Sequence, residues 1–147
     1  MASDKIKQFL YSWKDGVIEI GKVFLEGGDY KKCAENFLSN HYAFDDEQVL
    51  FKPTFTKEVI FRNNKDHALS YFIQGSIEED KGFALKPWGS IDLVELNSIE
   101  DKSLLVAMGT LNFKPVNQDD TTLVAFTFLL IEVDGSLKIK THHSSPV

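Results

Sequence analysis

Residues 121–145, TTLVAFTFLLIEVDGSLKIKTHHSS, carry the pattern that decides the fold. Two runs enriched in β-branched and aromatic residues, 121–133 and 136–145, flank the dipeptide Asp134-Gly135. Asp-Gly between two such runs is a strong signal for a β-hairpin, because both residues tolerate the backbone conformation of a tight turn. The stretch therefore predicts two long antiparallel strands joined by a short turn.

The same strand signals occur upstream. Residues 83–97 and 103–114 show a similar enrichment, with turn signals at Asn97-Ser98 and at residues 117–120. Four consecutive long strands of this kind predict an antiparallel sheet. A short extended run is expected at residues 49–51, and a second one at residues 57–62.

The first half of the chain predicts helices. Apolar residues in 4–25 recur with the 3.6-residue period of an amphipathic helix, and similar patterns predict helices at 30–41 and 65–73. Helices followed by consecutive antiparallel strands indicate an α+β fold, in one domain over residues 1–147. A curved sheet wrapped over the first helix would leave a pocket on its concave side.

Composition excludes several classes of protein. The net charge of −6 and the absence of a basic stripe argue against a nucleic-acid partner. No run approaches the roughly 20 apolar residues that span a bilayer, so no membrane partner is expected. The single cysteine, Cys33, excludes an internal disulfide and a cysteine-based metal cluster, and we expect it to be a buried, inert thiol. These features predict a cytoplasmic protein.

The C-terminal residues 141–147, THHSSPV, concentrate two imidazoles and three hydroxyls. If Leu137 and Ile139 face the core, strand alternation assigns the following residues alternately to the two faces of the sheet. The inner face then receives Thr141, His143 and Ser145, and the outer face receives Lys138, Lys140, His142 and Ser144. Polar groups at the inner end of an apolar strand need partners, which a pocket would supply. The alternative is a solvated C-terminal tail.

No phosphate-binding glycine loop, nucleophile-elbow serine or metalloprotease helix occurs in the sequence. The adjacent His142 and His143 point to opposite faces of a strand, so one ion is not expected to bind both, and we predict no metal and no cofactor. Tyr71 could turn its hydroxyl toward a cavity, the alternative being a core tyrosine with one hydrogen bond. Arg62 is expected at the surface, the alternative being a partner for a buried carboxylate.

Four segments in order resemble a known family: Val49–Thr54 (VLFKPT), Phe61-Arg62, Ala68–Phe72 (ALSYF) and His142–Ser145 (HHSS). They are similar to small proteins related to the association domain of calcium/calmodulin-dependent kinase II, and more closely to the iota-class carbonic anhydrases. The resemblance implies a cone-shaped fold of the nuclear-transport-factor-2-like, ketosteroid-isomerase-like type. It also implies a homodimer that forms through the sheet.

The resemblance further implies that threonine, tyrosine and serine hydroxyls hold bicarbonate and the attacking water. In this sequence those residues are Thr54, Tyr71 and either Ser144 or Ser145. Pro146 follows Ser145 directly, whereas the family motif has a leucine between them, and strand alternation favours Ser145 as the inward serine. His143, beside it, would relay the proton.

The function predicted on this basis is reversible, metal-free hydration of carbon dioxide to bicarbonate, which makes the protein a carbonate dehydratase. The alternative is a non-catalytic module of the same fold that binds a small anion or mediates oligomerisation. Isomerase or dehydratase chemistry would require an inward carboxylate as general base, and only Asp92 and Glu95 are candidates for that role.

Overall fold

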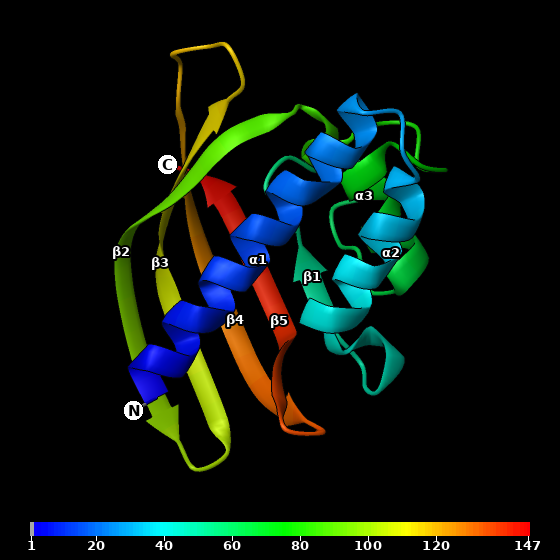
Figure 1. Cartoon of the computed structure of the whole chain (residues 1–147). Coiled ribbons are helices and arrows are strands. Elements are labelled where there is room, and N and C mark those ends of the chain that lie inside the picture. The colour runs from blue at the N-terminus through cyan, green and yellow to red at the C-terminus, as the bar shows by residue number, and fades with distance from the viewer. Residues whose placement is uncertain (1) are drawn as a thin grey trace.

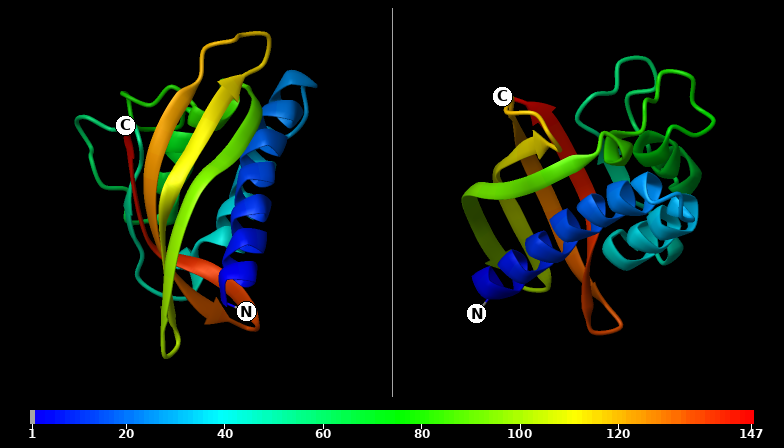
Figure 2. Two further views of the ribbon diagram at one scale, coloured as in Figure 1. Left: turned by 90° about the vertical axis from the view of Figure 1, so that its left-hand side faces the viewer. Right: turned by 45° about the horizontal axis from the view of Figure 1, so that its top comes forward.

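The computed structural model describes residues 2–147 and consists of a curved five-stranded sheet with three α-helices on its concave side (Figures 1 and 2). The helices are α1 (Ala2–Leu25), α2 (Tyr30–His41) and α3 (Lys65–Ile73), with short 3-10 helices η1 (Ala43–Asp45) and η2 (Phe83–Leu85). The strands are β1 (Leu50–Lys52), β2 (Trp88–Asp101), β3 (Leu104–Pro115), β4 (Thr122–Val133) and β5 (Ser136–Pro146). The predicted α+β class is confirmed.

The strand order is β1-β5-β4-β3-β2, so the C-terminal strand lies inside the sheet. Strands β2 to β5 pair antiparallel, and only β1 runs parallel to its neighbour β5. This pairing places Phe51 beside His142 and Lys52 beside His143. The tail is therefore held on both sides by backbone hydrogen bonds, and the alternative of a solvated C-terminus is wrong.

Helix α1 crosses the concave face of the sheet, with α2 and α3 beyond it (Figure 1). Its apolar stripe packs on β4, where Phe9 and Trp13 meet Phe128 at ring-centroid distances of 6.0 and 5.9 Å. Asp29 caps α2 by accepting a hydrogen bond from the Lys32 backbone N–H. No helix in the described part of the chain is both long and apolar enough to cross a membrane.

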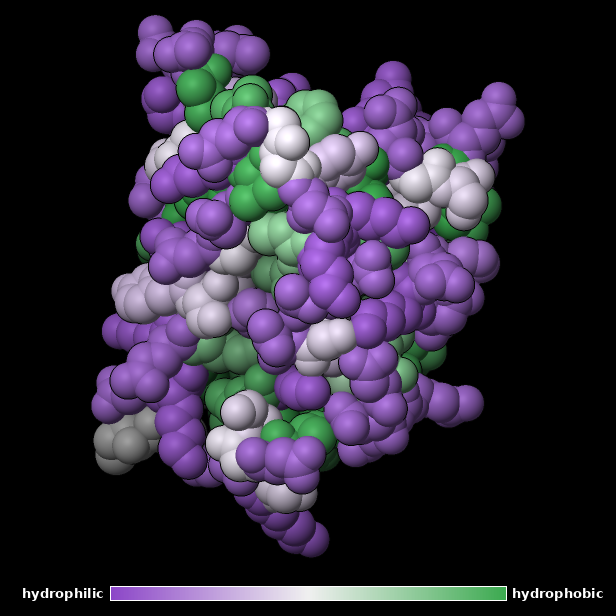
Figure 3. Space-filling model, turned by 45° about the vertical axis from the view of Figure 1, so that its right-hand side comes forward, coloured by the Kyte–Doolittle hydropathy of each residue, from purple (hydrophilic) through white to green (hydrophobic). Residues whose placement is uncertain are grey.

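The outer surface over the helices is mainly hydrophilic, and hydrophobic side chains reach it only in separate areas (Figure 3). The larger exposed apolar side chains of the sheet lie elsewhere, on strands β1 to β3. They include Leu50, Val94, Ile99 and Met108, which are 59, 62, 66 and 56% exposed. The convex face of the sheet thus carries apolar area that the helices do not cover.

Two predicted boundaries and one predicted extended segment are wrong. The turn expected at Asn97-Ser98 lies after Asp101, because β2 pairs with β3 along its whole length. Residues 83–87 precede the strand and form η2 and a turn instead. Residues 57–62 form a loop and not a strand, because side chains satisfy most of its backbone groups and only the Arg62 N–H bonds to β1, at the Phe51 carbonyl.

The predicted faces of β5 are also wrong beyond Ile139. Ile139 pairs with Leu130 and Thr141 pairs with Leu129, so Lys140 is an extra residue in β5. Such a bulge inverts the alternation of all later side chains relative to a regular strand. His142 and Ser144 consequently face the core, whereas Thr141, His143 and Ser145 lie on the convex face.

Candidate active site

A small cavity lies between the sheet, α1 and α3, and three hydroxyl-bearing residues line it: Thr54, Tyr71 and Ser144. All three are buried, with exposed fractions of 8, 6 and 4%. The rest of the lining is largely apolar and includes Phe51, Phe72, Phe83, Leu111, Phe113 and Val124. The free volume of about 10 Å³ is close to the least that holds one water molecule.

Tyr71, from the middle of α3, points its hydroxyl toward the loop that follows β1. Its Oη accepts a hydrogen bond from the Phe55 backbone N–H at 3.2 Å, and the buried Thr54 lies on the same cavity wall. Burial raises the pKa of Tyr71 well above its ordinary value. The phenol therefore stays neutral, and because the Phe55 N–H donates to its oxygen, its own proton is available to donate.

Lys52 links the two segments that carry Thr54 and Ser144. Its Nζ donates to the backbone carbonyl of Ser144 at 2.9 Å and to that of Thr54 at 3.3 Å. Burial lowers the pKa of this ammonium from its ordinary value. The lysine holds the ends of β1 and β5 at a fixed separation and places positive charge beside the cavity.

Ser144 ends a buried chain of hydrogen bonds that starts on α1. The chain joins Trp13 Nε1 to Tyr42 Oη at 3.2 Å, Tyr42 Oη to His142 Nδ1 at 2.8 Å, and His142 Nε2 to Ser144 Oγ at 2.6 Å. Phe51 stacks on the His142 ring at 4.7 Å. This packing and these bonds fix the imidazole in place.

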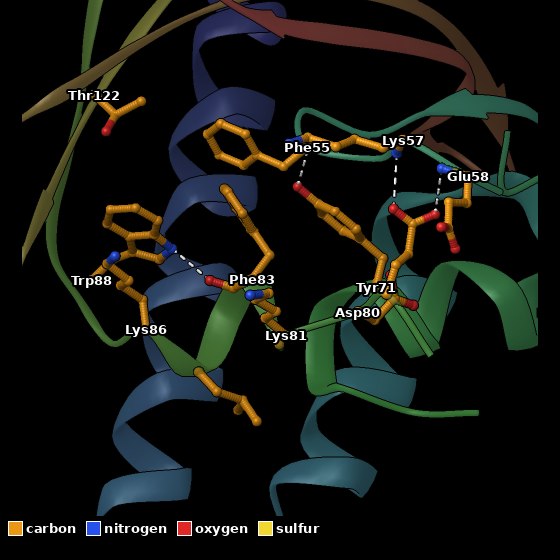
Figure 4. Close-up of a pocket in the computed structure, with 13 residues that line it drawn as sticks. Phe55, Lys57, Glu58, Tyr71, Asp80, Lys81, Phe83, Lys86, Trp88 and Thr122 are labelled. Atoms are coloured by element: carbon orange, nitrogen blue, oxygen red, sulfur yellow. Dashed lines mark hydrogen bonds between the residues drawn. The ribbon is translucent and has the colours of Figure 1, made fainter. Parts of the chain in front are cut away.

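A larger open pocket of about 680 Å³ adjoins the cavity (Figure 4). Tyr71 and Phe83 line both spaces, so these two side chains separate the pocket from the cavity. The Phe55 ring lies 6.2 Å from Phe83. Three lysines contribute to the wall of the open pocket, namely Lys57, Lys81 and Lys86.

The loop that presents Thr54 and Phe55 is fastened by buried charges. Arg62, predicted at the surface, is fully buried and forms a two-bond ion pair with Asp80, at 2.6 and 2.7 Å. The prediction was wrong because local sequence patterns do not reveal a carboxylate partner 18 residues away along the chain. Arg62 also donates to the Val59 carbonyl, and Glu79 accepts three backbone N–H groups of residues 57–59.

The structure thus brings Thr54, Tyr71 and Ser144 together and leaves out two other predicted residues. His143 and Ser145 line a shallow groove on the convex face, with Met108 and Thr127, and the orientation predicted for them is wrong. The prediction missed His142, which is 4% exposed, and Tyr42. His142 was missed because the bulge at Lys140 contains no glycine and could not be predicted from the sequence. Tyr42 was missed because no local sequence pattern links it to the C-terminus.

Across residues 2–147, no group of three His, Cys, Asp or Glu side chains is placed to hold a metal ion. Asp92 and Glu95 are exposed, so neither is the inward carboxylate that isomerase or dehydratase chemistry would require.

Residues 4–146 match the metal-independent carbonic anhydrase family. The chain belongs to this family. It is 30% identical over 140 residues to the metal-independent carbonic anhydrase of Nostoc sp. (strain PCC 7120), a match that covers 91% of this chain and 68% of that protein. The predicted resemblance and the predicted class of enzyme, carbonic anhydrase, are confirmed.

Solved structures agree with this assignment. A cyanobacterial iota-carbonic anhydrase complexed with bicarbonate has a TM-score of 0.90 and 28% identity, over 97% of this chain and 90% of that one. Two more distant structures, at 16 and 20% identity, share the fold. They are a putative kinase II association domain from Xanthomonas campestris (TM-score 0.68, covering 97 and 85%) and an NTF2-like protein from Shewanella oneidensis (0.60, covering 99 and 99%). The predicted fold is confirmed.

Proposed function

We propose that this carbonic anhydrase hydrates carbon dioxide in the cavity lined by Thr54, Tyr71 and Ser144. The observation that carries the proposal is the convergence of three buried hydroxyls, with the His142 imidazole, in a cavity whose other walls are mainly apolar. Carbon dioxide is apolar and suits the aromatic walls. The oxygens that gain charge during hydration need hydrogen-bond donors already in place, and such donors act strongly where water is excluded.

Each hydroxyl has a distinct role in this proposal. Tyr71 donates to a substrate oxygen, because the Phe55 N–H already donates to its own oxygen. Thr54 orients the attacking water. Ser144 contacts the oxygens of carbon dioxide and bicarbonate, while Lys52 adds a favourable potential for the anion at the base of the site.

Substrate reaches the cavity through the open pocket. Bicarbonate is larger than the present free volume of about 10 Å³, so lining side chains must move when it binds. Phe83 separates the two spaces and packs against the partly exposed Phe55, which makes this aromatic pair the movable barrier. The pocket wall also carries Glu58, Glu79 and Asp80, but Arg62 pairs with Glu79 and Asp80. Lys57, Lys81 and Lys86 then face only Glu58, and the remaining positive charge favours entry of the anion.

A homodimer formed through the convex face of the sheet is part of the proposal. Cross-strand pairing aligns Asn97, Met108, Thr127 and His143 in one row of that face. Met108 at its centre is 56% exposed, and Ile99 and Leu50 extend the apolar area. A partly apolar sheet face that the helices leave uncovered is the kind of surface that a second copy can bury.

We also propose that the protein works in the cytoplasm. The support is its one free cysteine, Cys33, which needs no oxidising compartment. Cell fractionation with an antibody against the chain tests this location.

The test of function is stopped-flow carbon dioxide hydration by chelator-treated protein, with and without added zinc or manganese. We expect turnover well above the buffer rate that neither metal changes. Absence of turnover together with thermal stabilisation by bicarbonate would favour the non-catalytic anion-binding module. Activity that appears only with added metal would contradict the metal-free proposal.

A further inference from the structure

We propose that the buried chain Trp13–Tyr42–His142 fixes Ser144 as a hydrogen-bond donor, so that Ser144 relays a proton and does not act as a nucleophile. Tyr42 is then a positioning residue for the reaction, although it does not line the cavity. This inference rests on the proposed function, since it assigns the role of one hydroxyl in that site.

The direction of these hydrogen bonds follows from the Trp13 indole, the one group in the series that cannot accept a hydrogen bond. The indole Nε1–H of Trp13 is a donor only, so it donates to Tyr42 Oη at 3.2 Å. The Tyr42 hydroxyl in turn donates to His142 Nδ1 at 2.8 Å. A neutral imidazole with Nδ1 as acceptor carries its proton on Nε2, and this N–H donates to Ser144 Oγ at 2.6 Å.

The opposite direction leaves a buried proton without a partner. If Ser144 donated to Nε2, His142 would carry its proton on Nδ1 and donate to Tyr42. The Tyr42 oxygen would then accept two bonds, and its own hydroxyl proton would have no acceptor among the described residues. Tyr42 is fully buried, and an unpaired buried donor costs about 1–3 kcal/mol, which selects the first direction by a factor of roughly 5 to 150.

The charge state of the imidazole agrees with this direction. Burial lowers the pKa of His142 to about 3, so the ring is neutral at physiological pH. A triad serine is activated by an imidazole whose Nε2 has a free lone pair. In this protein Nε2 carries the proton, so His142 donates a hydrogen bond to Ser144 and does not accept one from it.

The chemical step then needs no separate base. The oxygen of water bonds to the carbon of carbon dioxide while water passes one proton to Ser144 Oγ. In the same step Ser144 passes its own proton to an oxygen of carbon dioxide, which forms carbonic acid, and the serine is regenerated. Carbonic acid loses its proton to solvent after release, so the sum is carbon dioxide and water to bicarbonate and a proton.

The first test is nitrogen-15 NMR of protein labelled at histidine. His142 should show a protonated Nε2 and an unprotonated Nδ1 at neutral pH, and this pattern should weaken in Tyr42→Phe. A wild-type signal with the proton on Nδ1 would overturn the inference. His67, exposed on α3, provides the internal reference for a solvated imidazole. This measurement needs no turnover, so it stands even where the proposed function fails.

The second test is kinetic. Tyr42→Phe keeps the buried ring and removes only the hydroxyl, and we expect kcat to fall about 10- to 100-fold with KM for bicarbonate nearly unchanged. Trp13→Phe should have a smaller effect in the same direction, and Ser144→Thr should retain more activity than Ser144→Ala. The matched control is Tyr11→Phe on the exposed face of α1, which should match the wild type. A folded Tyr42→Phe with wild-type kcat would refute the positioning role.

Discussion

The Arg62–Asp80 pair offers the sharpest test of how the site is held in place. Arg62 is fully buried, and its guanidinium makes two bonds of 2.6 and 2.7 Å to Asp80, which also accepts from Ser70 Oγ at 2.6 Å. Asp80→Asn keeps the shape of the side chain but leaves the guanidinium charge in the interior without its carboxylate. Removing one partner of a buried ion pair costs about 3–5 kcal/mol.

The expected loss lies near the lower end of that range, about 3 kcal/mol, because the Glu79 carboxylate remains 3.6 Å from Arg62. For a chain of this length the loss corresponds to a fall in melting temperature of roughly 6–12 °C. Loss of hydration activity should exceed loss of folded protein at 25 °C, because the same pair fastens the loop that carries Thr54 and the Phe55 N–H. Urea unfolding and the hydration assay measure the two effects separately.

The control is Asp45→Asn, which breaks the Lys65–Asp45 pair on the surface. The side chains of Lys65 and Asp45 are 33 and 47% exposed, so the free energy of unfolding should fall by less than about 1 kcal/mol. The double replacement Arg62→Met with Asp80→Leu should recover much of the stability, because it leaves no unpaired charge, but not the activity. An Asp80→Asn protein as stable as Asp45→Asn would refute the account of this pair.

Four further predictions follow from the site and the surface. Tyr71→Phe should lower kcat by about 100-fold or more with little change in melting temperature, measured by stopped-flow hydration. The pKa of His142 is about 3 in the folded protein, whereas that of an unfolded histidine is about 6.5, so between these pH values only the unfolded state binds the extra proton. The free energy of unfolding should therefore fall as pH falls from 6.5 toward 3, and His142 contributes up to about 1.4 kcal/mol per pH unit to this fall. Urea titrations of His142→Gln should lack that contribution. Met108→Lys should convert the proposed dimer to a monomer in sedimentation, and an unchanged mass would exclude this face as the interface. Replacing Lys57, Lys81 and Lys86 by Gln should raise KM for bicarbonate a few-fold and reduce its salt dependence, since exposed charges act at long range only at low ionic strength.

Much of the fold was predictable because its signals are local. The helices at 30–41 and 65–73 begin and end where the sequence predicts, since Asp29 and Asn64 cap them with side-chain bonds to nearby backbone N–H groups. The hairpin at Asp134-Gly135 is equally local, with both residues at positive φ. What failed depends on distant partners: Glu79 organises residues 57–59 from 20 residues away, and Asp80 draws Arg62 into the interior.

The faces of β5 show why part of the site could not be predicted by strand alternation alone. Alternation is correct for Ile139 and fails from Thr141 on, because the single extra residue Lys140 inverts every later side chain. No glycine or other turn-forming residue at this position indicates the bulge. Lys140 is accommodated because its ammonium reaches Glu47 at 2.8 Å and the Gln48 carbonyl at 3.3 Å, both before β1. Contacts with a segment some 90 residues earlier thus stabilise the bulge in β5. The bulge in turn places His142 and Ser144 at the cavity, and not His143 and Ser145.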